Sequence, residues 1–421
     1  MTGISLDRVG SSAPHARSDA PPAQRVLARA LALRRRQTER LADAIDAVAA
    51  ASVDLAERIA AGGQLLVFGS GSALPDARHL ALEFLHPVIV GKRAVAALAL
   101  DPAREACAGL GDPGDVAVAI VGSEPAPETW RALAEARARG LRTVALASAA
   151  SAPTSAEHVL DPCASDPRLA KESRVALYHL LWELCHVHLE ESERLAPSDT
   201  GGETGVESLY PFLGAGRGDA EAVGRDLRAS GRAKLSTLTA LRDVTVERHA
   251  SELERCGSAL AGARARGSGL FSFGNGGSQT DADWIASWLS TASAPRWRAR
   301  SLAADPAVLT ALANDVGFAR VFARQIAALG RPGDVALGVT TSGSSENVIA
   351  GLAEARRRGL LAVGLAGGDG GRLAREGEVD FLFVVPSDSV HRTQEVQAML
   401  PHLLDELSGG AAPQEEFPCA S

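Results

Sequence analysis

Two polar loops in the later part of the chain have the residue types that bind a phosphate. Gly274-Asn-Gly-Gly-Ser278 and Thr340-Thr-Ser-Gly-Ser-Ser345 each follow an apolar run and precede a helical pattern. Glycines let backbone N–H groups approach an anion, and hydroxyls at a helix N-terminus add donors. No lysine follows the glycines, so neither loop is a nucleoside-triphosphate loop. The pattern favours a phosphate monoester site, although ordinary helix caps and turns use the same residue types. The candidate phosphate ligands are Asn275, Ser278, Thr340, Thr341, Ser342 and Ser345.

The elements that position these loops occur twice along the 421 residues. Residues 67–72 recur as 272–277, and residues 111–119 recur as 330–338. Colinear matches in one order indicate two tandem copies of one domain. In each copy short apolar runs alternate with helical patterns, which predicts α/β architecture with a roughly five-stranded parallel sheet flanked by helices on both faces.

The apolar runs predict five strands in each copy. They cover 64–68, 94–100, 115–121, 143–147 and 158–160, then 269–273, 298–303, 334–339, 361–365 and 379–385. A long helical pattern opens each copy, over 25–61 and 221–266, and a final helix closes each, over 171–189 and 394–407. We therefore expect a disordered tail over 1–24, a first half over 25–195, a Gly-rich linker over 196–220, a second half over 221–409 and a tail over 410–421.

The second half resembles the phosphoheptose isomerases of the sugar-isomerase (SIS) superfamily. The matching motifs are the two loops, Asp281, Asn314-Asp-Val-Gly-Phe318, Gly330-Arg-Pro-Gly-Asp334, Gly367-Gly-Asp-Gly-Gly371, and Gln394-Glu395 with His402. The resemblance implies two tandem SIS domains and the aldose–ketose isomerisation of a heptose phosphate, such as sedoheptulose 7-phosphate, through an enediol. It also implies sites at subunit contacts. Many members hold zinc with a His and a Glu one helical turn apart, and with a Gln and a His on the last helix.

The family's His and Glu are missing from the second half, where Trp284 and Trp288 take the aligned positions. An indole neither abstracts a proton nor binds a hard cation. The first half restores both groups as His79 and Glu83, which share one helix face because they are four residues apart. It also keeps the last-helix histidine as His179.

Other aligned positions differ between the halves. Lys171 stands where the second half has Gln394, and we interpret it either as a replacement for the metal charge or as a surface lysine. Gln394 and His402 remain candidates for substrate binding. Asp305 lies where the family places an aspartate on the substrate side, and His391 is a sugar contact or a helix cap.

Each half therefore lacks what the other keeps, since the first half also has Glu124 in place of the hydroxyl loop. Our hypothesis is a composite site in which Glu83 is the base, His179 is the acid, and the second half binds the phosphate. His79, Glu83 and His179 could also hold zinc. Independent decay of a duplicated domain would also remove residues from both halves. The alternative function is a noncatalytic sugar-phosphate-binding regulatory or assembly protein.

Composition and net charge limit the classes of partner that the chain is expected to bind. A net charge of −8 and a pI near 5.8 disfavour nucleic acid and anionic membranes. Five scattered cysteines indicate a reducing compartment, and no apolar stretch reaches the length of a membrane span. No secretion signal opens the chain, so we expect a cytoplasmic protein that binds a small sugar phosphate. A homo-oligomer, with two copies per chain, would let a dimer mimic the family tetramer.

Overall fold

The computed structural model describes residues 22–89, 91–104, 108–124, 126–195, 220–291, 293, 296–377 and 379–413. Helix α1 begins at Pro22, within the stretch that the sequence assigns to a tail. The rest of that tail, the linker up to residue 219 and the chain from residue 414 lie outside the described residues.

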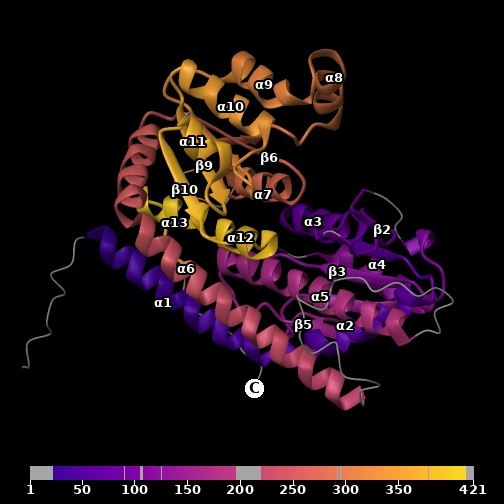
Figure 1. Cartoon of the computed structure of the whole chain (residues 1–421). Helices are drawn as coiled ribbons and strands as arrows, with labels where there is room; N and C mark the ends of the chain where they lie inside the picture. The colour runs from indigo at the N-terminus through magenta and orange to yellow at the C-terminus, as the bar shows by residue number, and fades with distance from the viewer. Residues whose placement is uncertain are drawn as a thin grey trace, which may run out of the picture.

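The first half contains one parallel sheet with helices on both faces (Figure 1). Its strands are β1 (Leu65–Phe68), β2 (Ala97–Leu100), β3 (Val116–Ile120), β4 (Arg142–Leu146) and β5 (His158–Leu160). Its helices are α1 (Pro22–Asp43), α2 (Ile45–Ala60), η1 (Gly71–Ala73), α3 (Leu74–Leu85), η2 (Ala108–Leu110), α4 (Pro127–Ala138) and α5 (Pro167–Leu195).

The second half repeats this plan with an additional helical segment after its second strand. Its strands are β6 (Gly269–Gly274), β7 (Arg298–Ser301), β8 (Val335–Val339), β9 (Leu361–Gly367) and β10 (Phe381–Val385). Its helices are α6 (Ala220–Ala265), α7 (Gly277–Thr291), α8 (Pro306–Val316), η4 (Phe318–Arg320), α9 (Val321–Leu329), α10 (Glu346–Arg357), α11 (Gly371–Glu376), α12 (Val390–Gln397) and α13 (Leu400–Leu407).

The two sheets have the same topology, as the internal repeat predicts. Their strand orders are β2-β1-β3-β4-β5 and β7-β6-β8-β9-β10, and all neighbouring strands are parallel. The first strand of each sheet therefore lies beside the third, β1 beside β3 and β6 beside β8. The two polar loops of the second half follow β6 and β8, so they begin at the ends of neighbouring strands. This arrangement places the loops after β6 and β8 at one edge of the second sheet, where parallel sheets bind ligands.

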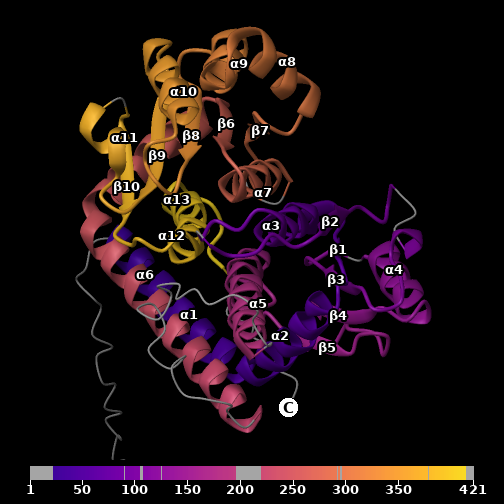
Figure 2. The same ribbon diagram turned by 45° about the vertical axis from the view of Figure 1, so that its right-hand side comes forward.

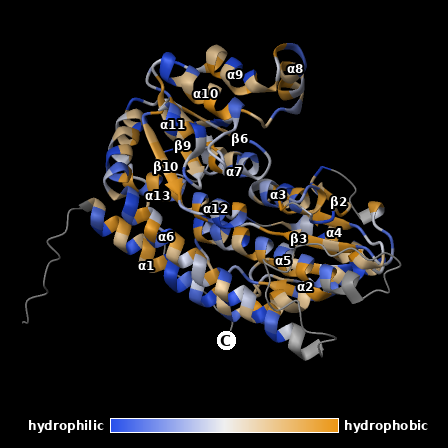
Figure 3. Ribbon diagram, viewed as in Figure 1, coloured by the Kyte–Doolittle hydropathy of each residue, from blue (hydrophilic) through white to orange (hydrophobic). Residues whose placement is uncertain are grey.

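A continuous apolar core joins the two halves. One cluster of buried side chains includes Leu55 and Val118 of the first half with Leu253 and Leu403 of the second. Separate clusters cover the outer face of each sheet, under α4 in the first half and under α9 and α10 in the second. Burial on both faces explains why the central strands β1, β3, β8 and β9 are apolar runs. The edge strand β7 is the exception, because its sequence is Arg-Ala-Arg-Ser and it is largely exposed; Figure 3 shows the hydropathy along the ribbon.

Long helices from the two halves pack against each other along one side of the molecule. Helix α1 packs against α6, and both contact α13 (Figures 1 and 2). Helix α3 of the first half packs against α7 of the second, and α5 packs against α12. The helices that carry the candidate residues of each half thus meet those of the other half. In the part of the chain that the structure describes, no helix is long and apolar enough to cross a bilayer.

Two helix predictions are corrected in detail. The pattern over 25–61 forms two helices, with a tight turn at Ala44, whose N–H bonds the Leu41 carbonyl. The final helix begins at Val390 rather than 394, and it is broken between Gln397 and Leu400. Pro401 explains this break, because it has no N–H to offer to the carbonyl four residues earlier.

Candidate active site between the two halves

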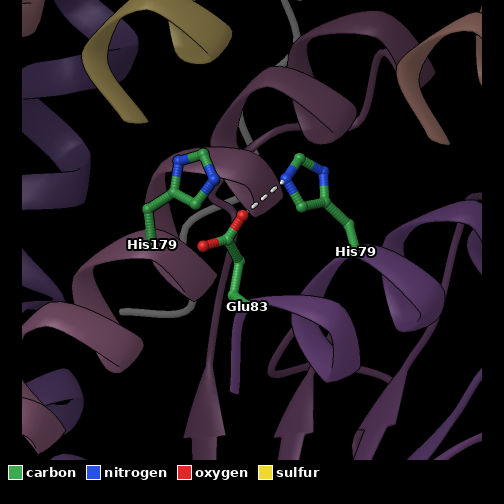
Figure 4. A group of neighbouring side chains, drawn as sticks. All are labelled: His79, Glu83 and His179. Atoms are coloured by element: carbon green, nitrogen blue, oxygen red, sulfur yellow. Dashed lines mark ion pairs between the residues drawn. The ribbon is translucent and has the colours of Figure 1, made fainter. Parts of the chain in front are cut away.

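His79, Glu83 and His179 lie together in the interior. His79 and Glu83 project from the same face of α3, and His179 projects toward them from the middle of α5 (Figure 4). Their potential ligand atoms all lie within 4.8 Å of one another, and all three side chains are buried. The Nε2 atom of His79 is 3.4 Å from Oε1 of Glu83. The i, i+4 spacing in the sequence therefore forms one polar cluster with a residue nearly a hundred positions away.

Neighbouring polar groups fix the orientation of the cluster. The Tyr178 hydroxyl is 2.9 Å from Nδ1 of His79, and Oε1 of Glu395 is 3.0 Å from Nδ1 of His179. Because both Nδ1 atoms have partners, both Nε2 atoms point into the cluster. Glu395 belongs to the second half, so residues of both halves position these two imidazoles.

Gln394 and Gly277 bring the second half directly against His79. A Cβ atom placed on Gly277 would lie 2.3 Å from Nε2 of Gln394 and 2.4 Å from Nε2 of His79. Both side chains therefore crowd the same point above the first residue of α7. Gly277 belongs to the Gly274–Ser278 loop, so the histidine of the first half adjoins the glycine-rich loop of the second.

His391 supplies a further contact from the second half. Its Nε2 lies 3.1 Å from Oε2 of Glu83, its Nδ1 lies 2.8 Å from Oε1 of Glu183, and its ring stacks on that of His179 at 4.4 Å. The sequence suggested a sugar contact or a cap for His391, and the structure places it against Glu83. Its position before Gln394 on α12 was the only available signal.

Burial and ion pairing set the protonation of this cluster. Burial lowers the pKa of His179 well below its usual value, which makes the ring a neutral imidazole. Although burial opposes it, the hydrogen bond with His391 and the nearby His79 ring bring the pKa of Glu83 down to about 2. Hydrogen bonds to Glu183 and Glu83 likewise overcome burial and raise the pKa of His391 to about 9. Glu83 is thus a carboxylate at neutral pH, beside a cationic His391.

Three buried nitrogen and oxygen atoms of the cluster make no hydrogen bond within the part of the chain that the structure describes and could coordinate a divalent metal. Among the described residues, Nε2 of His79, Nε2 of His179 and Oε1 of Gln394 are buried with no hydrogen-bond partner. Such atoms are costly to bury unless something coordinates them. With Oε1 of Glu83 they make a nitrogen and oxygen donor set of the type that zinc takes. Glu395 and Tyr178 would be the outer partners that orient the two histidines.

The hydroxyl loop forms a compact donor array at the start of α10. Oγ1 of Thr340 lies 3.0 Å from Oγ of Ser345 and 3.5 Å from Oγ of Ser342. Gly343 has a φ of 63° and meets the carbonyl of Gly370, so only glycine fits the centre of the loop. Ser342 is exposed and Thr340 is buried, which places the hydroxyls along a path from the surface inward.

The two loops and the polar cluster are structurally connected. Asn275 exchanges two hydrogen bonds of 2.8 Å with Asn347 at the start of α10. Nε2 of Gln397 donates to the Thr340 carbonyl at 3.0 Å, and Gln397 lies one turn after Gln394 on α12. Ser278 is buried in the first turn of α7. Helix α12 thus contacts the hydroxyl loop and the His79 cluster together.

Three other candidates have different surroundings. Lys171 pairs with Asp76 and lies 3.2 Å from Oδ1 of Asp281, so its charge is matched by two carboxylates. His402 lies 2.8 Å from Glu172 on the side of the two tryptophans. Asp305 caps α8 by accepting from the N–H groups of residues 307 and 308. Gln394, rather than Lys171, is the residue that adjoins His79.

Comparison with known proteins agrees with this architecture. The model of the SIS domain family matches residues 235–367. A phosphoheptose isomerase of Paramagnetospirillum magneticum is 45% identical over 166 residues, which are 38% of this chain and 84% of that protein. A phosphoheptose isomerase of Aquifex aeolicus is 42% identical over 165 residues, which are 38% of this chain and 85% of that protein.

Solved structures match almost the whole chain at low identity. The C-terminal domain of glucosamine-fructose-6-phosphate aminotransferase from Francisella tularensis has a TM-score of 0.58 at 11% identity, covering 91% of this chain and 98% of that one. Tagatose-6-phosphate ketose/aldose isomerase from Escherichia coli has a TM-score of 0.54 at 12% identity, covering 92% and 94%. These similarities concern the fold alone.

The repeated sheet and its polar loops define a protein with two SIS-like domains. The chain belongs to the phosphoheptose isomerase family and is an isomerase.

Proposed function

We propose that this chain interconverts the ketose and aldose forms of a heptose phosphate, with sedoheptulose 7-phosphate as the ketose, in one composite site. The observation that carries the proposal is the convergence of His79 and Gln394 above Gly277. It joins the proton-transfer groups of the first half to the glycine-rich loop of the second. Neither half contains both sets of groups.

The hydroxyl loop is proposed to hold the phosphate. Hydroxyls of Thr340, Ser342 and Ser345 gather at the N-terminus of α10, where the helix dipole favours an anion. Asn275 and Ser278 line the neighbouring loop at the start of α7. A phosphate bound there would direct the sugar chain inward, toward Glu83.

Proton transfer then falls to Glu83 and His179. The Glu83 carboxylate removes the proton from C1 of the ketose, while His179, as the neutral tautomer that carries its proton on Nε2, gives that proton to the oxygen on C2, which yields the enediol. Glu83 returns its proton to C2, and His179 recovers a proton from the oxygen on C1, which yields the aldose. Both groups end as they began, so the cycle is balanced.

A metal bound here would take the place of the Nε2 proton of His179, so the two arrangements are alternatives. His79, Glu83, His179 and Gln394 would hold it, because their free nitrogen and oxygen atoms face one another. When bound, zinc would supply Lewis-acid polarisation of the substrate oxygens. His391 keeps one oxygen of Glu83 hydrogen-bonded, which leaves Oε1 to face His79.

Turnover of sedoheptulose 7-phosphate by the purified full-length chain tests the proposal. We expect measurable isomerisation, and we expect Glu83→Gln to lower kcat by at least about a hundredfold, the usual contribution of a general base. Glu254→Gln is the matched control, because this helical glutamate lies on an exposed part of α6 and should leave kcat unchanged.

Two results would reject the proposal. Full turnover in the Glu83→Gln variant would remove Glu83 from the mechanism. Binding of the sugar phosphate without turnover in the wild type would favour the noncatalytic regulatory or assembly function that the two tryptophans also allow.

A further inference from the structure

A pair of asparagines joins the two polar loops of the second half. Asn275 lies in the glycine-rich loop after β6, and Asn347 lies in the first turn of α10, directly after the hydroxyl loop. Nδ2 of each asparagine donates to Oδ1 of the other at 2.8 Å, across 72 positions of the chain. Among the described residues, no other hydrogen bond between side chains connects residues 274–278 with residues 340–347.

The pairing engages the donor and the acceptor of both side-chain amides. Each amide has one NH2 group and one oxygen, and here each gives an N–H to its partner and accepts one in return. Oδ1 of Asn347 also accepts from the N–H of Val348 at 3.0 Å, and the Asn347 side chain is buried. An aspartate at either position would lack the N–H that the partner oxygen needs. The pair therefore fixes the separation of the two loops without adding a charge.

The first half has the same sheet without this pair. Ser70 stands where the second half has Asn275, and it bonds Asp101 at 2.7 Å. Glu128 stands where the second half has Asn347. Because the strand order is the same in both halves, the fold does not require the asparagine pair. The pair accompanies the hydroxyl loop, and the half without that loop has lost both asparagines.

Both loops lead into helices whose N-termini offer donors to an anion. Helix α7 begins at Gly277 and α10 begins at Glu346. The first turn of an α-helix leaves backbone N–H groups without a carbonyl partner inside the helix. Together with the hydroxyls of Thr340 and Ser345, these N–H groups are suited to a phosphate. One phosphate can contact donors of both loops only while the loops keep a fixed separation.

We infer that Asn347 is a positioning residue for the phosphate, and that it acts through Asn275. The two amides hold the glycine-rich loop and the hydroxyl loop at the separation that lets one phosphate contact both. This inference rests on the proposed phosphate site. It assigns Asn275 to the bridge between the loops, whereas the sequence suggested a direct phosphate ligand.

A double-mutant cycle on the full-length chain tests this inference. The probe is sedoheptulose 7-phosphate, with Kd measured by calorimetry and with KM, kcat and the thermal midpoint measured in parallel. We expect Asn347→Ala and Asn275→Ala each to raise Kd and KM by about tenfold at unchanged kcat. The double variant should raise them no further, because the two residues act as one unit. Asn347→Asp keeps the volume but loses the donor to Asn275, so it should raise Kd at least as much.

Asn314→Ala is the matched control. Asn314 is the third asparagine of the chain, and its exposed amide donates to the neighbouring Asp315 at 2.9 Å, so Kd should stay within twofold. An unchanged Kd in Asn347→Ala overturns the inference. Additive effects also overturn it, because they would give each asparagine its own contact with the ligand, and so does a wild type that binds no sugar phosphate. Binding with the expected cycle but without turnover contradicts the isomerase activity alone.

Discussion

Replacing Gly277 by alanine would test the meeting of the two halves with a single methyl group. The new Cβ would lie 2.3 Å from Nε2 of Gln394 and 2.4 Å from Nε2 of His79. Gly277 has no positive φ, so the alanine backbone itself is unstrained. The added methyl group therefore acts on the site and leaves the path of the chain alone.

The size of the effect follows from these contacts. Ordinary carbon–nitrogen contacts begin near 3.4 Å, so each side-chain end must move by about 1 Å. Both side chains are buried and His79 is held by the Tyr178 hydroxyl, so making room for the methyl group changes the geometry of the cluster. A displacement of about 1 Å at a catalytic group lowers rates by about a hundredfold, which is about 2.7 kcal/mol of activation free energy.

The assay is kcat/KM for sedoheptulose 7-phosphate, measured together with the thermal midpoint of unfolding. Gly262→Ala is the matched control, because it lies within α6 and its Cβ would meet only the Arg266 guanidinium at 3.3 Å. The control should gain about 0.5–1 kcal/mol of stability, as alanine does over glycine inside a helix, and should keep full activity. A folded Gly277→Ala chain with wild-type kcat/KM would refute the composite site.

Three further predictions follow from other contacts. Ser342→Ala should raise KM for the sugar phosphate by about tenfold or more at unchanged kcat, since it removes one hydrogen bond to a charged group; a fall in kcat alone would contradict this. Dialysis against a chelator should lower turnover, and zinc should restore it in the wild type but not in His79→Ala, with metal content measured in parallel; full activity of metal-free protein would exclude the metal. Glu172→Gln should lower the free energy of unfolding by about 3–5 kcal/mol at pH 7, because Arg34 and Arg242 remain buried without their carboxylate. Although burial opposes it, Arg34 and the hydrogen bond with His402 hold the pKa of Glu172 well below its usual value. The difference between the two proteins should therefore be complete above about pH 4.3 and shrink at lower pH, as urea titrations at pH 7 and pH 3 would show; a constant difference would refute it.

Much of the fold could be predicted because the same pattern of strands and helices occurs twice in the sequence. The strands lie where the apolar runs place them, and the equal sheet orders follow from the repeat. The break at Ala44 has no glycine or proline to mark it. The break before Leu400 could have been predicted from Pro401.

The candidate site was harder to predict, because the residues that meet there come from different halves. Alignment within one half associates His79 with Lys171, whereas the structure sets Gln394 beside His79. A linear alignment shows which residues are equivalent, but it does not show which half completes which site. The contacts of His391 with Glu83 and of Glu395 with His179 also depend on how α12 packs on α5.

The substitutions that distinguish the two halves are unevenly distributed between two places, the cluster of His79, Glu83 and His179 and the surroundings of Trp284 and Trp288. This distribution bears on how the duplicated domain evolved. Independent decay of two copies would scatter losses over both locations. Instead the replacements Trp284, Trp288 and Glu124 adjoin one pocket. The retained His79, Glu83, His179 and Gln394 all lie at the other location. In a symmetric oligomer of single domains every substitution appears in every site, so one site cannot change alone. Covalent duplication removes that constraint, and this separation is the one expected when selection maintains a single polar site while its counterpart is free to change.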